Sequence, residues 1–195
     1  MLCACAPRVS MRVPSEAVAE LPLERRLTLL DAENDLLAAT DAVDARQEQV
    51  DEIPALREQA EERKRAAGTQ EQNGHDSAAV TAMHEGEARV DYLEHDAEVR
   101  RANLHVAQAA LLVAQARFEE ARATEVEAAA LPGSRGVRRA EYHEQVERLA
   151  KVQAAAESEA AKTRASAAEA EKKWRAARAE LTRQTGGAQG SAWVQ

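Results

Sequence analysis

The sequence predicts an all-α fold, an elongated antiparallel three-helix bundle or coiled coil with a long helical hairpin at about 77–131 and 137–183. Three observations predict it. Of the 195 residues 45 are alanine, whereas glycine (8), proline (5) and aromatic residues (3%) are scarce, as is typical of long helices. Apolar residues recur every seven positions over several segments. Most prolines and glycines fall between those segments.

The first residues, 1–14, are expected to form a disordered N-terminal segment, because they show neither helical periodicity nor the apolar core of a signal peptide. Cys3 and Cys5 are the only cysteines, and they lie too close in sequence for an unstrained disulfide. The sequence leaves their role open. It also leaves open whether the natural start is Met1 or Met11.

The first helix is expected at about 22–67, where Leu29, Leu36 and Val43 recur every seven residues. Pro54 interrupts this pattern, and a proline inside a helix removes a backbone hydrogen bond and clashes with the preceding turn. We therefore expect a break near Pro54. Gly68 is expected to end the helix, with the polar residues 68–76 forming a loop.

The second and third helices are expected at about 77–131 and 137–183, joined by the turn-forming residues 131–136. In the second helix, Met83 begins a heptad row that reaches Phe118. In the third, Tyr142 and Trp174 fall on the apolar rows. The bundle would thus occupy 15–184, followed by a flexible C-terminal tail at 185–195.

An uncharged stretch of the second helix, residues 102–116, has apolar side chains on every side. A helix that is apolar all round is a buried helix, so we expect both neighbouring helices to cover it. Three helices could suffice in a monomer. Because some side chains point in several directions, we instead expect a second chain to complete the burial. The residues predicted to bind a partner there are Leu104, His105, Val106, Leu112 and Val113.

The turn between the second and third helices is expected to protrude beyond the first helix as a basic tip. It carries Arg135, Arg138, Arg139 and Tyr142, which could contact an acidic partner, although an ordinary solvated turn would also fit. Trp193 lies in the tail. It could dock into a groove of a partner or belong to an unstructured end.

The motifs of enzymes and metal sites are missing. No Glu-x-x-His pair of di-iron bundles, no His-Glu-x-x-His zinc motif and no phosphate-binding glycine loop occurs. We therefore predict no catalytic residue, no cofactor, no metal and no small-molecule substrate.

The function predicted from the sequence is that of a non-enzymatic structural or adaptor protein acting through helical surfaces. It would work in a homo-oligomer or a larger assembly such as a virion or secretion complex. The net charge of −8 disfavours nucleic acid and membranes as partners. The alternative is a peripheral membrane- or nucleic-acid-associated bundle using Lys172, Lys173 and Arg175. Without a signal peptide or transmembrane segment in the sequence, a cytoplasmic location is expected, or a virion if a phage encodes the chain.

Overall fold

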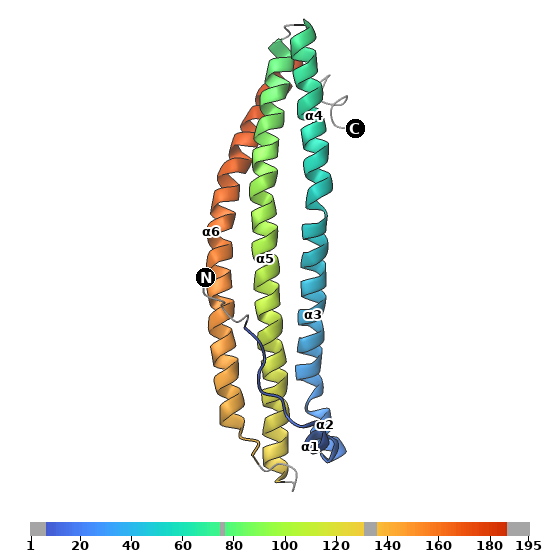
Figure 1. The fold of residues 1–195 in the computed structure, drawn as a ribbon, viewed down its shortest axis with the longest axis vertical. Helices are drawn as coiled ribbons and strands as arrows, with labels where there is room; N and C mark the ends of the chain where they lie inside the picture. Colours follow the sequence, from blue (N-terminus) through green and yellow to red (C-terminus); the bar gives the residue numbers. More distant parts are fainter. Residues whose placement is uncertain (1–6, 75–76, 131–135, 187–195) are drawn as a thin grey trace, which may run out of the picture. The chain divides into compact units, whose positions relative to one another are not determined.

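A computed structural model describes residues 7–74, 77–130 and 136–186, and this part of the chain contains helices and no strand (Figure 1). The helices are α1 (Ser15–Ala19), α2 (Leu23–Leu27), α3 (Leu30–Asp51), α4 (Ile53–Gly74), α5 (Ser77–Ala129) and α6 (Arg139–Thr185). The predicted all-α class is confirmed. The chain divides into two compact units. The first contains 1–47 and 103–158, and the second contains 48–102 and 159–195.

The predicted break near Pro54 is confirmed, because α3 and α4 are separated at Glu52. Pro54 is the second residue of α4, where its missing N–H is tolerated. Arg100 on α5, also in the second unit, forms hydrogen bonds to residues at this break. Its Nη1 donates to the main-chain carbonyl of Gln49 at 2.8 Å and to the Glu52 carboxylate at 3.0 Å. One of the carbonyls that a helix end leaves without a helical partner is thereby satisfied.

The predicted helix end at Gly68 is wrong, because α4 continues to Gly74. An internal glycine costs a helix only about 1 kcal/mol relative to alanine, which the burial of Ala60 and Ala67 on the same helix can offset. The loop expected at 68–76 is thus helical as far as residue 74. Residues 75 and 76 lie outside the described part of the chain.

The longer α4 changes how it pairs with α5 in the second unit. A turn centred at residue 72 would place Arg57 opposite residue 88, but Arg57 forms its ion pair with Glu94 at 2.8 Å. Because the turn between α4 and α5 lies further along the chain than predicted, each residue of α4 faces a residue of α5 that comes later in the sequence. The two helices approach closely at Gly86, where an added Cβ would lie 3.1 Å from Lys64 Cα.

Trp174 packs α6 against α5 in the second unit, in agreement with its predicted place on an apolar row. Its ring stacks on Tyr92 with the centroids 5.1 Å apart. Its Nε1 donates to Glu85 at 2.7 Å. The guanidinium groups of Arg89 and Arg178 lie 5.9 and 5.8 Å from the ring centre, within range for cation–π attraction.

Two apolar clusters form the core of the first unit. One contains Val13, Ala17, Leu21, Ala123, Val126, Val137 and Tyr142. The other contains Val113, Ala116, Val146 and Leu149. The third predicted helix is confirmed with small shifts at its ends, since α6 begins at Arg139 and includes Thr185. Of the predicted tail, 187–195 lie outside the described residues.

The predicted disorder of the N-terminal segment is wrong for residues 7–14. Val13 is only 4% exposed and belongs to the first apolar cluster, and Val9 packs on the second. The segment has no helical periodicity because it is not a helix. Its irregular backbone passes over α5 in the first unit (Figure 1).

The apolar face predicted for the first helix is correctly oriented but poorly covered. Leu29 is buried, and Leu36 and Val43 are half-buried, yet α3 itself contains no buried residue. Leucines on the other side of α2 and α3 are exposed. Not all leucines of this segment are therefore buried, as they would be if they all packed against the uncharged stretch of α5.

Candidate partner-binding surfaces

The hairpin tip between α5 and α6 is not bare, contrary to the prediction. Tyr142 is 7% exposed and lies in the apolar cluster with Val13, Ala17 and Leu21. Burial raises the pKa of the Tyr142 phenol, and the carboxylate of Glu119 raises it further. Its assignment as a partner-binding residue is wrong because α1 and the segment before it fold back over this end of the first unit.

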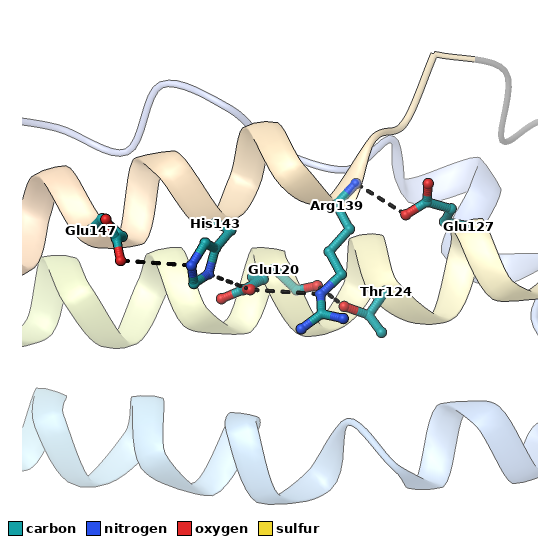
Figure 2. Close-up of polar contacts among 6 residues, drawn as sticks. All are labelled: Glu120, Thr124, Glu127, Arg139, His143 and Glu147. Carbon is teal, nitrogen blue, oxygen red and sulfur yellow. Dashed lines mark hydrogen bonds and ion pairs between the residues drawn. The ribbon is translucent and has the colours of Figure 1, made fainter.

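The basic side chains of the tip lie beside carboxylates of the same chain, as Figure 2 shows. His143 Nδ1 lies 3.0 Å from the Glu120 carboxylate, and its Nε2 lies 3.7 Å from Glu147. The side chain of Arg139 reaches Glu120 at 3.8 Å, while its main-chain N–H donates to Glu127 at 3.1 Å. A carboxylate at this N–H also complements the start of α6.

Arg138 projects from the same end and is exposed, with its Nη1 3.9 Å from Glu141. Arg135 lies outside the described residues. The described part of the tip therefore presents charges of both signs, where the sequence predicted a basic surface for an acidic partner.

Two buried polar side chains hold the N-terminal segment. Glu119 accepts a hydrogen bond from the main-chain N–H of Val13 at 2.7 Å and pairs with Arg122 at 2.8 Å. The amide oxygen of Gln145 accepts from the main-chain N–H groups of Ser10 and Met11 at 2.8 and 3.0 Å. Glu119 and Gln145 are 7% and 2% exposed. Neither residue stands out in the sequence, since one Glu or Gln on a long helix resembles any other.

The uncharged stretch of α5 is buried on one side only. Val113 is 3% exposed and lies in an apolar cluster, and Leu112 packs against it. Val113 is therefore a core residue, and its assignment to a partner-binding surface is wrong. Leu104 and Val106 are half-buried, and His105 is exposed. The prediction that a second chain contacts these three residues stays a prediction.

Among the described residues, the large apolar side chains that are exposed belong to α2 and α3. They form what we call the leucine stripe: Leu23, Leu27, Leu30 and Leu37, which are 61%, 54%, 47% and 58% exposed. A single apolar face, as predicted for this segment, does not include these four leucines. The signal was present in the doublets at 29–30 and 36–37, because adjacent residues on a helix point about 100° apart.

Carboxylates predominate along α3, which carries the second half of the leucine stripe. The helix α3 contains seven acidic residues and one arginine. Asp41 and Asp44 continue the stripe beyond Leu37, and both are exposed. The surface thus joins an apolar row to a strongly acidic one.

The basic part of α6, which the alternative prediction would use, carries its cations in pairs with glutamates one turn away. Lys172 bonds to Glu169 at 2.6 Å, and Arg175 bonds to Glu171. The hydrogen bond from Lys172 lowers the pKa of Glu169. All these groups but Glu171 are exposed, so the pairs are of the kind that contributes little to stability.

The described part of the chain contains no candidate metal site. No group of three or more His, Cys, Asp or Glu side chains there could hold a metal ion. None of the described helices combines the length and apolar character needed to span a bilayer. Cys3, Cys5 and Trp193 fall outside the described ranges.

No protein-family model, no curated protein and no solved structure matches the chain. The surfaces above are therefore the observations from which a function can be inferred.

Proposed function

We propose that this protein is a non-enzymatic structural or adaptor protein that binds other protein chains through helical surfaces, in a homo-oligomer or a larger assembly. The leucine stripe is the observation that carries the proposal. Single exposed leucines are ordinary on protein surfaces. Four of them within fifteen residues of α2 and α3, all roughly half exposed or more, concentrate apolar surface in the way that marks interaction sites.

The chemistry of the stripe fits a helical partner. Leu30 and Leu37 are seven residues apart, and Asn34 lies between them at coiled-coil spacing. Covering such side chains gains about 25 cal/mol for each Å² of apolar surface removed from water. A polar residue between leucines at these positions is also how coiled coils fix register and partner.

Site-specific cross-linking in cells of the natural source tests the proposal. A photoreactive phenylalanine analogue would replace Leu37 in one variant and Ala42 in another. Ala42 is an exposed residue of the same helix that lies off the stripe. We expect a discrete protein adduct from position 37 and none from position 42. No adduct from position 37, or the same adducts from both positions, would refute the proposal.

A further inference from the structure

The exposed face of α3 follows one pattern from Leu30 to Asp44. Leu30, Asn34, Leu37, Asp41 and Asp44 are spaced alternately four and three residues apart, and all are exposed. This spacing defines a straight seam along a helix that pairs with another helix. The seam changes from apolar to acidic after Leu37. Neither Asp41 nor Asp44 forms an ion pair with another described residue.

The helix α6 carries an exposed seam with the same spacing. It consists of Ala161, Ala165, Ala168, Lys172 and Arg175, all of them exposed. Three small side chains come first and two cations follow. The two seams are therefore complementary position by position. Where α3 has a leucine or an asparagine, α6 has an alanine, and where α3 has an aspartate, α6 has a cation.

We propose that the leucine stripe of one copy binds this seam of α6 on a second copy, with the two helices parallel and Leu30 opposite Ala161. The inference rests on the proposed function, because it names the partner of the same surface. Equivalent positions of a parallel coiled coil face each other, so Leu37 lies opposite Ala168. A large side chain opposite a small one lets two helices approach closely and still fill the space between them.

The charges select this orientation and register. With Leu30 opposite Ala161, Asp41 lies opposite Lys172 and Asp44 lies opposite Arg175. An antiparallel alignment of the same two seams would place Leu30 near Arg175 and Asp44 near Ala161. It would place a cation against a leucine and leave the Asp44 carboxylate against an alanine with no opposite charge, and removing that carboxylate from water without a partner costs free energy.

The wider charge balance of the two helices supports the same pairing. The helix α3 has seven acidic residues and one arginine, whereas residues 162–183 of α6 contain seven Lys and Arg and three Glu. Complementary surfaces speed association and disfavour wrong partners. Contact between two copies of the acidic α3 seam would bring like charges together and is disfavoured on the same ground.

Charge reversal tests the register. One variant carries Asp41→Lys and Asp44→Arg, and the other carries Lys172→Asp and Arg175→Asp. All four positions are exposed, so we expect both variants to keep their helical circular dichroism. Light scattering after size exclusion should give a mass of two or more chains for the natural protein and a single-chain mass for each variant. An equimolar mixture of the two variants should recover the larger mass, because each reversed seam then faces its opposite.

A single-chain mass for the natural protein at every concentration would overturn the inference. So would two folded variants that still associate, or whose mixture fails to do so. A gain of affinity provides an independent check. In the proposed register Glu33 flanks the seam beside Glu169 of the second copy, so Glu33→Lys should strengthen association, and an unchanged or weaker association would contradict the register.

The cross-link from position 37 separates this inference from the proposed function. An adduct with the mass of two copies of this chain supports both. An adduct with a different protein overturns the second copy as partner and leaves the proposed function standing. Absence of any adduct overturns both.

Discussion

Single polar residues decide where the N-terminal segment lies. Residues 10–13 form no helix or sheet, so their main-chain N–H groups need acceptors elsewhere. Glu119 and Gln145 provide them from α5 and α6. No side-chain nitrogen or oxygen that is buried in the described residues lacks a partner. Composition and periodicity could not reveal this arrangement, because it depends on two side chains far away in the sequence.

We expect Glu119→Ala to destabilise the first unit by about 2–3 kcal/mol, since it leaves the buried Val13 N–H and the half-buried Arg122 guanidinium without their acceptor. Glu119→Gln keeps one acceptor oxygen and should cost less. Urea unfolding followed by circular dichroism measures both losses. Hydrogen exchange at the Val13 amide should speed up in the alanine variant.

Glu147→Ala is the matched control for this change, because Glu147 is an exposed residue with a single contact at 3.7 Å to His143. We expect it to change the free energy of unfolding by less than about 0.5 kcal/mol. Equal losses in the two alanine variants would show that Glu119 does not hold the segment.

At the scale of elements, the sequence predicted the helices and the break at Pro54 well because heptads and prolines are local signals. It failed at Gly68 because tertiary packing can override a propensity difference of about 1 kcal/mol. It failed for Leu30 and Leu37 for a different reason. Assigning one apolar face to a helix presumes that every leucine is buried, and here a second row of leucines lies on the side that the chain itself leaves exposed.

Gly68 and Gly86, which both lie inside helices, should respond with opposite sign to alanine. At Gly68 a Cβ would meet only the Met83 sulfur at 4.0 Å, so Gly68→Ala should stabilise the protein by up to about 1 kcal/mol through helix propensity. At Gly86 a Cβ would lie 3.1 Å from the Lys64 backbone. Gly86→Ala should therefore force α4 and α5 apart and lower the melting temperature.

Thermal unfolding of the two alanine variants decides the matter, and Gly86→Leu should be more destabilising than Gly86→Ala. If both alanine variants melted at higher temperatures than the natural protein, the close approach of α4 to α5 at Gly86 would be refuted.

The break between α3 and α4 should depend on Arg100. Arg100→Met keeps much of the apolar stem but removes the hydrogen bonds to Gln49 and Glu52. We expect a loss of about 1–2 kcal/mol, with faster amide exchange confined to residues near Glu52. Arg57→Met removes only an exposed ion pair with Glu94 and should cost less than about 1 kcal/mol. A larger effect from Arg57 would contradict this assignment.

At the scale of the whole molecule, charge is the property that sequence alone determines most directly. The chain carries 34 acidic and 26 basic residues, and its isoelectric point is about 5.3. What composition could not show is how the two signs are distributed, with carboxylates along α3 and cations along the second half of α6. That distribution appears only when residues are placed on exposed faces.

Solubility should be lowest near pH 5.3, where net charge and the repulsion between copies vanish. The protein left in solution after centrifugation, measured across a pH series, locates the minimum. The variant with Asp41→Lys and Asp44→Arg should move it to higher pH, and the variant with Lys172→Asp and Arg175→Asp to lower pH. If the pH of lowest solubility were the same in both variants as in the natural protein, association at this pH would not depend on net charge.

The docking of the N-terminal segment has a consequence for synthesis on the ribosome. Ser10 donates to Gln145, a residue 135 positions later in the chain. At roughly 5–20 residues per second, the ribosome adds that residue about seven seconds to half a minute after the segment has been made. The segment is therefore made well before the residue that holds it in place. Until then Val13, Ala17 and Leu21 lack their neighbours on α6, so a nascent chain stalled before residue 145 exposes apolar surface that chaperones recognise.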